Sequence, residues 1–217
     1  MQDTYRHKGL RKRLIDTLRE KGIGDERILR AFDSVPRHFF LDKAFEEWAY
    51  TDKAFPIGNK QTISQPFTVA YQTDLLEVES KDKVLEIGTG SGFQAAILAT
   101  LGARVFTVER QQFLYQKTAK LLKKLGFKSI RTFLKDGMKG LPEFAPYDKI
   151  IVTAAADEIP TTLLSQLKNG GILIIPIGQR RQQMCKIIKV SKSQYQRMYL
   201  DYFKFVPLLK GLNREME

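Results

Sequence analysis

The stretch VLEIGTGSGF, residues 84–93, decides the fold of this chain. A short strand-like run ends in three glycines at alternate positions, Gly88, Gly90 and Gly92, and a helical pattern follows at once. Glycines at such a junction let the backbone turn sharply and let a ligand approach the amino end of the helix. The stretch therefore predicts a strand, a ligand-binding turn and a helix that begins near Ser91.

The same alternation continues along the chain. Strand-like runs read KVLEI, RVFTV, RTFLK, DKIIVTA and GILIIPI, and amphipathic stretches such as QAAILATL and FLYQKTAKLLKKL lie between them. Apolar strands joined by helices indicate a doubly wound, Rossmann-like α/β fold with a mostly parallel sheet covered on both faces. After residue 178, two strand-like runs without a helix between them predict an antiparallel hairpin at the sheet edge.

Helical periodicity dominates the first 80 residues. Amphipathic patterns cover the region around Leu14, the segment that starts at Asp25, the segment 36–50, and a stretch that begins near Pro66. We therefore expect one domain in three parts. These are a helical N-terminal extension over 1–80, an α/β core over 81–178 and an antiparallel C-terminal edge over 179–217.

Composition narrows the class of protein. A chain of 217 residues suits one α/β domain, and no apolar run is long enough to span a membrane. The single cysteine, Cys185, allows no internal disulfide, which favours a cytoplasmic location and a packing role for its thiol. The net charge of +12 leaves a nucleic-acid partner open, but the dispersed basic residues favour a solvated surface.

An acidic side chain just before the glycine turn indicates which ligand the turn binds. A dinucleotide fingerprint needs a third glycine at position 93, where this chain has Phe93. Glu86 would repel a pyrophosphate and attract a cation. S-adenosylmethionine carries an ammonium and a sulfonium but no phosphate, so we expect this ligand. The residues expected to hold it here are Glu86, Gly88, Thr89, Gly90 and Gly92.

Two further acids follow the next strands. Glu109 ends the second strand, where a carboxylate can accept hydrogen bonds from ribose hydroxyls. Asp136, followed by Gly137, comes after the third strand, where it can accept from the adenine amine. Taken alone, each acid could be an ordinary solvent-exposed residue of a loop. Three acids at the ends of successive parallel strands indicate one shared crevice.

Several segments together resemble the protein-L-isoaspartate O-methyltransferases, a family of class I S-adenosylmethionine-dependent methyltransferases. They are VPRHFF, AFPIGNKQTISQPFTVAYQTDLL, KVLEIGTGSGFQAAILA, KDGMKGLPEFAPYDKIIVTAAADEIP, LKNGGILIIPIG and KFVPLL, and they extend from about Gly9 to Leu209. The resemblance implies methylation of the α-carboxyl of L-isoaspartyl residues in damaged proteins, with S-adenosylhomocysteine as the second product. The ester then collapses to a succinimide, whose hydrolysis restores some normal aspartate.

The resemblance also implies roles for particular residues. Ser64, in QTISQP, is the active-site serine, while Thr62 and Ile63 belong to the loop that closes over the methyl donor. The residues implied on the peptide-binding side are Val206, Pro207, Leu208 and Leu209. One position departs from the family, because Lys60 stands where glycine is usual. If the backbone there needs a positive φ, the lysine is strained or the loop takes another path.

The sequence shows no clear catalytic base or metal site, and a carboxylate as methyl acceptor would need neither. The chain has only two histidines, His7 and His38, both in the N-terminal region, and no His/Cys/carboxylate spacing typical of a metal site. A carboxylate needs neither base nor metal, because with a pKa of about 4 it is ionised at neutral pH. A neutral hydroxyl such as Ser64 could orient it, although Ser64 could instead be the N-cap of the helix near Pro66.

Two other functions remain open on the sequence alone. An RNA or small-molecule methyltransferase on the same fold is supported by the basic charge. A binding protein without catalysis is weakened by the complete set of acids and glycines.

Overall fold

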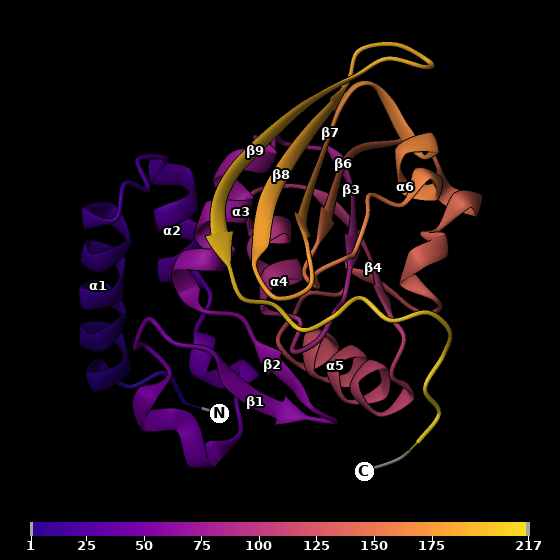
Figure 1. Cartoon of the computed structure of the whole chain (residues 1–217). Coiled ribbons are helices and arrows are strands. Elements are labelled where there is room, and N and C mark those ends of the chain that lie inside the picture. Colours follow the sequence, from indigo (N-terminus) through magenta and orange to yellow (C-terminus); the bar gives the residue numbers. More distant parts are fainter. Residues whose placement is uncertain (1, 216–217) are drawn as a thin grey trace.

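A computed structural model describes residues 2–215 and shows one seven-stranded sheet with helices on both sides (Figure 1). The strand order is β5-β4-β3-β6-β7-β8-β9. Strands β3 to β7 run parallel, and β8 and β9 are antiparallel to their neighbours. Their bounds are β3 Lys83–Ile87, β4 Arg104–Glu109, β5 Arg131–Leu134, β6 Tyr147–Val152, β7 Leu167–Ile177, β8 Gln182–Lys189 and β9 Tyr195–Phe203. The predicted fold class, including the antiparallel hairpin at the edge, is confirmed.

Alternate residues of each central strand enter different cores. Val84 packs in a core with α3 (Pro66–Leu76), α4 (Phe93–Thr100) and α5 (Gln112–Lys124), while its neighbour Leu85 packs in a core on the other face. That second face is covered by shorter elements, namely α6 (Thr161–Ser165), η3 (Gly137–Lys139) and η4 (Pro142–Phe144). A strand buried on both faces must be apolar along its whole length, which explains the continuous apolar runs. Cys185 is fully buried in the second core, in agreement with a packing role.

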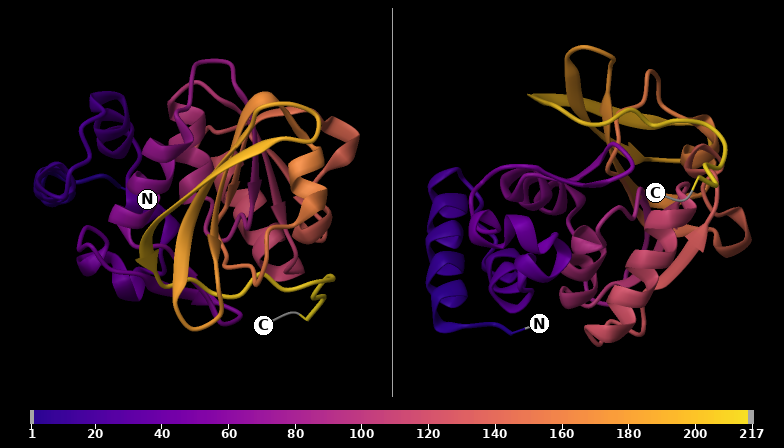
Figure 2. Two further views of the ribbon diagram at one scale, coloured as in Figure 1. Left: turned by 45° about the horizontal axis from the view of Figure 1, so that its top comes forward. Right: turned by 90° about the horizontal axis from the view of Figure 1, so that it is seen from below.

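The N-terminal region forms an outer helical layer. Helices α1 (Tyr5–Glu20) and α2 (Glu26–Ser34) pack on α3 and α4, and Figure 2 shows them at the outer side of the molecule. Asp25 caps α2 through the backbone N–H of Arg27, as the acidic start of this segment suggested. No helix within residues 2–215 is long and apolar enough to cross a membrane.

The helix expected over 36–50 is replaced by two short 3₁₀ helices, η1 (Arg37–Phe40) and η2 (Lys43–Trp48). Leu41 between them is extended, and the Asp42 carboxylate accepts the backbone N–H of Ala44 to start the second turn. An Asp that bonds the local backbone in this way competes with a continuous helix. The predicted single helix is therefore wrong in this segment.

A small antiparallel hairpin, which the sequence pattern did not reveal, precedes α3. Strand β1 (Phe55–Gly58) pairs with β2 (Gln61–Ile63), and Asn59 and Lys60 form the turn with φ values of 47° and 57°. Two positive φ values at the centre of a two-residue turn suit the right-handed twist of a hairpin. The backbone at Lys60 therefore has the left-handed conformation that glycine adopts easily, and the lysine is strained there.

The C-terminal segment leaves the sheet after Phe203. Residues 204–215 run back across the carboxyl ends of the parallel strands, and Figure 1 shows this segment passing from β9 towards α5. Pro207 bridges to Ala155 beyond β6, and Asn213 bridges to Gln111 at the start of α5. The antiparallel edge expected over 179–217 therefore holds only as far as Phe203.

Candidate active site

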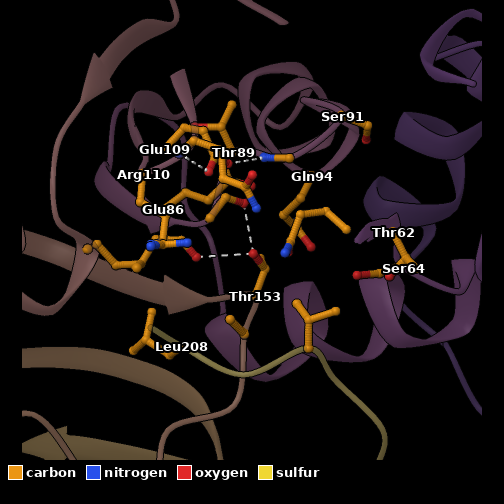
Figure 3. A pocket seen from close by; sticks show the side chains of 18 of the residues that line it. Thr62, Ser64, Glu86, Thr89, Ser91, Gln94, Glu109, Arg110, Thr153 and Leu208 are labelled. Carbon is orange, nitrogen blue, oxygen red and sulfur yellow. Dashed lines mark hydrogen bonds between the residues drawn. The ribbon is translucent and has the colours of Figure 1, made fainter. Parts of the chain in front are cut away.

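A cavity lies at the carboxyl ends of β3, β4 and β6, where the strand order turns from one direction to the other. Ligands in open α/β sheets bind at this topological switch point. Figure 3 shows the side chains that face the cavity from both sides of the sheet end. Of the residues predicted from the sequence, those that line it are Thr62, Ile63, Ser64, Glu86, Gly88, Thr89, Gly90, Glu109, Gly137, Val206, Pro207, Leu208 and Leu209.

The glycine turn takes the backbone conformations that glycine allows. Gly88, Gly90 and Gly92 have φ values of 96°, 49° and 86°. A side chain on Gly88 would place its Cβ 2.4 Å from Oγ1 of Thr153, so glycine at this position leaves room for the Thr153 hydroxyl. Gly92 is the N-cap of α4, which begins at Phe93 rather than at Ser91, and Gly92 does not line the cavity.

Glu86 has one carboxylate oxygen in a hydrogen-bonded chain and the other without a partner. Thr89 donates to the hydroxyl of Thr107 over 2.7 Å, and Thr107 donates to Oε2 of Glu86 over 2.5 Å. Oε1 is buried and has no hydrogen-bond partner in the described part of the chain. Burial, together with the nearby Glu109 carboxylate, raises the pKa of Glu86 to about 8. This oxygen lacks a cation or a strong donor.

Glu109 is fixed by the backbone. Its two oxygens accept the N–H groups of Gly90 and Gln111, each at 2.9 Å, so the end of β4 is tied to the glycine turn. Burial raises the pKa of Glu109, and the two backbone bonds oppose that shift. Each oxygen keeps a free lone pair, and the ribose contact stays a prediction.

Asp136 lies at the edge of the site rather than in its lining. Its carboxylate accepts the backbone N–H of Met138 at 3.0 Å and that of Gly211 at 2.9 Å. It therefore caps η3 and holds the C-terminal segment. The neighbouring Gly137 lines the cavity, and the adenine contact of Asp136 stays a prediction.

Two glutamines that sequence reasoning missed add acceptors to the same cavity. The amide of Gln94 donates to the hydroxyl of Thr73, whose own hydrogen is used on the carbonyl of Val69. The amide of Gln111 donates to the carbonyl of Asn59. These partners determine the orientation of each amide, so that Oε1 of Gln94 and Oε1 of Gln111 are the buried atoms without partners.

The cavity thus contains three unsatisfied acceptors when Glu86 is ionised. Oε1 of Glu86, Gln94 and Gln111 are three of the four buried side-chain atoms without partners in residues 2–215, and all three residues line this cavity. Buried acceptors without donors are costly, so a ligand that supplies N–H, O–H or positive charge is favoured. A pyrophosphate supplies only acceptors and does not fit this set.

Ser64 does not cap the helix that follows it. The N-cap of α3 is Gln65, and the cap is provided by Asp52, whose Oδ1 accepts the N–H of Phe67 at 2.8 Å. The Ser64 hydroxyl has no hydrogen-bond partner within residues 2–215 and faces the cavity, as Figure 3 shows. The alternative of a plain N-cap is therefore wrong, and the hydroxyl is available to a ligand.

A second cavity meets the first at Ser64. It lies between the start of α3 and residues 202–206 at the end of β9, with Tyr202, Phe203 and Phe205 among its lining. The residues shared by both cavities are Thr62, Ser64, Thr153 and Val206. Two ligands in these cavities would therefore come together beside the Ser64 hydroxyl.

Thr153 is a further residue that the sequence analysis missed. It follows the last residue of β6, and its hydroxyl donates to the backbone at the end of β3, 2.8 Å from the Gly88 carbonyl. The strand-end rule that identified Glu109 would also have found Thr153. Gln94 lies inside α4, where no sequence pattern singles it out.

Asp3, His7 and His38 come together away from this site, with one ligand atom of each within 4.8 Å of the others. The imidazole rings stack at 3.9 Å between centroids, and His38 is hydrogen-bonded to Tyr50. Asp3 is paired with Arg11. With these groups already engaged, the cluster ties the N-terminal segment to η1 rather than presenting free metal ligands.

Comparison with known proteins agrees with the site. The model of the protein-L-isoaspartate(D-aspartate) O-methyltransferase family, PCMT, matches residues 9–213. The chain belongs to this family. A protein-L-isoaspartate O-methyltransferase of Christiangramia forsetii is 54% identical over 213 residues, which cover 98% of this chain and 100% of that protein. The enzyme of the same name from Flavobacterium johnsoniae is 52% identical over 213 residues, with the same coverage.

Solved PCMT structures share the fold. A protein-L-isoaspartate O-methyltransferase structure superposes with a TM-score of 0.83 at 31% identity, covering 91% of this chain and 65% of that longer chain. The PCMT of Plasmodium falciparum, solved in complex with S-adenosyl-L-homocysteine, gives a TM-score of 0.80 at 24% identity, covering 92% of this chain and 98% of that one. The family membership confirms the resemblance drawn from the motifs.

Proposed function

We propose that this protein methylates the α-carboxyl of L-isoaspartyl residues in damaged proteins, with S-adenosylmethionine in the first cavity and the peptide in the second. Family membership supports the reaction. The observation that carries the assignment of the site is the shared wall of the two cavities, where the Ser64 hydroxyl has no partner among residues 2–215.

The lining of the first cavity fits the donor. An ammonium group would satisfy the unpartnered oxygen of Glu86, and Oε1 of Gln94 could accept a second N–H. Glu109 and Gln111 supply acceptors for ribose hydroxyls on the other side of the glycine turn. The only basic residue in the lining is Arg110, whose Nε is bonded to the Gly211 carbonyl. A cationic ligand with hydroxyls is therefore complementary to this cavity.

The second cavity suits a peptide. Its aromatic lining offers apolar surface for side chains, and Lys204 gives it a positive group that can attract a carboxylate. Val206 to Leu209 line the first cavity while the backbone of Val206 and Leu208 is held by Ala155, so this segment forms a rigid wall between the ligands. The contacts of Val206, Pro207, Leu208 and Leu209 with the peptide are proposed from this placement.

The residues at the junction need only orient the reacting groups. The donor supplies a methyl group on a positive sulfur, and the bound carboxylate takes it as the carbon–sulfur electron pair returns to sulfur. No proton is transferred, so no base is required, and no histidine lines either cavity. The Ser64 hydroxyl can hold one carboxylate oxygen in line with the methyl group. Because this donor is neutral, it stabilises the ionised ground state less than a cation would.

Substitution of Ser64 by alanine tests this role. We expect turnover on an isoaspartyl peptide to fall by about ten- to a hundred-fold, the contribution of one oriented hydrogen bond, while donor affinity stays within about two-fold. Since Ser64 is not a cap, the melting temperature should change little. Ser165→Ala, which removes a surface hydroxyl at the end of α6, is the matched control and should keep full turnover. Full turnover of folded Ser64→Ala would contradict the assignment.

A further inference from the structure

Arg37 is a buried cation whose partners are backbone carbonyls. Its side chain is only 1% exposed, and Nη1 donates to the carbonyl of Ala49 at 2.6 Å. Nη2 donates to the carbonyls of Lys53 and Ser64 at 3.1 and 3.0 Å. No carboxylate within residues 2–215 forms an ion pair with the guanidinium. The segment that contains Ala49 and Lys53 and the residue Ser64 thus converge on one side chain.

Such a cation is costly to bury. Burial lowers the pKa of Arg37 to about 9, and Nε has no hydrogen-bond partner in the described part of the chain. The rings of Phe55 and Phe93 lie 5.9 and 5.8 Å from the guanidinium carbon and partly offset the lost hydration. An apolar side chain would fill this space without the desolvation cost. The charge and fork of the guanidinium therefore require another explanation than packing.

A second anchor holds the residues that follow Ser64. Asp52 accepts the N–H of Phe67 at 2.8 Å and the side-chain amide of Gln65 at 2.9 Å. Arg37 holds the carbonyl of Ser64 itself. The carbonyl of the residue with the free hydroxyl and the two positions Gln65 and Phe67 after it are thus held by two side chains that do not line either cavity.

We propose that Arg37 is a positioning residue, which together with Asp52 sets the place of the Ser64 hydroxyl at the junction of the two cavities. This inference rests on the proposed role of Ser64. A fixed carbonyl determines the orientation of the peptide unit from which the Ser64 side chain extends. Arg37 reaches neither ligand, so its whole effect on turnover passes through Ser64. A displacement of an orienting group by about 1 Å can cost as much as 100-fold in rate.

A double-mutant cycle between Arg37 and Ser64 tests the proposal. Arg37→Lys keeps the positive charge but loses the fork that binds three carbonyls. We expect kcat on an isoaspartyl peptide to fall about ten-fold in the wild-type background, and by less than about two-fold in the Ser64→Ala background. Donor affinity should stay within about two-fold in all four proteins.

A matched control distinguishes the specific role of Arg37 from the general effect of changing a buried cation. Lys189 is also buried, at 8% exposure, and donates to the carbonyls of Leu164 and Leu167 on the opposite side of the sheet. Lys189→Met should lower the melting temperature as Arg37→Lys does, yet keep kcat. If Arg37→Lys does not fold, Asp52→Asn, which removes the acceptor for Gln65, replaces it in the same cycle with the same expected pattern.

The outcomes separate this inference from the proposed function. Equal losses of kcat in both backgrounds would overturn the positioning role while leaving the role of Ser64 intact. Unchanged kcat in a folded Arg37→Lys variant would overturn it as well. Full turnover of Ser64→Ala alone would instead refute the role proposed for the serine, and the coupling with it.

Discussion

Replacing Glu86 by glutamine should weaken donor binding and at the same time stabilise the ligand-free protein. The carboxylate is 0% exposed, and one of its oxygens has no partner among residues 2–215, so ionisation is opposed until a cation arrives. Glutamine has nearly the same shape, can still accept from Thr107, and never ionises. The substitution therefore removes a functional charge together with its cost.

The magnitude follows from the pKa. Burial raises the pKa of Glu86 from its usual 4.5 to about 8 in the folded protein. Between these two pH values the unfolded chain releases the Glu86 proton, whereas the folded chain keeps it. The contribution of protonated Glu86 to the free energy of unfolding is therefore fully present below pH 4.5 and is lost as the pH rises through about 8. At about 1.4 kcal/mol for each pH unit, the wild type loses about 3–4 kcal/mol between pH 5 and pH 8. Glu86→Gln avoids that loss.

Melting temperature across pH, with calorimetry of donor binding, is the assay. The ligand-free variant should melt about 6–16 °C above the wild type at pH 8 and close to it near pH 4. Its donor affinity should be about 10–100-fold weaker, the value of a hydrogen bond between charged groups. Wild-type binding at pH 7 should release a proton, and the variant should release none. Glu20→Gln, which neutralises an exposed carboxylate on α1, is the control. A variant less stable than the wild type at pH 8, or unchanged donor affinity, would refute the reasoning.

Three further expectations concern the same region. Glu109→Ala should weaken donor binding by about 1.5–3 kcal/mol, since it loses both the ligand contact and the bond to Gly90; calorimetry showing unchanged affinity would remove Glu109 from the donor site. Lys60→Gly should stabilise the hairpin turn by about 1 kcal/mol without changing kcat, because glycine accepts the φ of 57° without strain; an unchanged or lower melting temperature would show that the lysine is not strained. At saturating donor, kcat should be flat from about pH 6 to 8 because the acceptor carboxylate is already ionised, and a steep rise across this range would indicate a base.

The sequence predicted the parts of the site that lie close together along the chain. Strand β3, the glycine turn and α4 follow from one ten-residue stretch, and Glu109 follows from the rule that parallel strands end at one edge. These features depend on local periodicity and topology. They could therefore be derived without knowing how distant segments pack.

The remaining features depend on contacts between distant segments. The cap of α3 comes from Asp52, fifteen positions before Phe67, so the local sequence could not decide between the active-site role of Ser64 and the N-cap alternative. The hairpin was missed because its turn has Asn59 and Lys60 in place of a typical asparagine–glycine pair. The unpartnered oxygens of Gln94 and Gln111 are determined by partners on other elements, which no sequence spacing records.

The most direct test of the central claim is methyl transfer from labelled S-adenosylmethionine to three acceptors side by side. They are an isoaspartyl peptide, its normal aspartyl twin and total RNA. The proposed function predicts label on the isoaspartyl peptide alone, released as methanol by mild base because the product is an ester. Equal labelling of the two peptides, base-stable label, or transfer to RNA would contradict it.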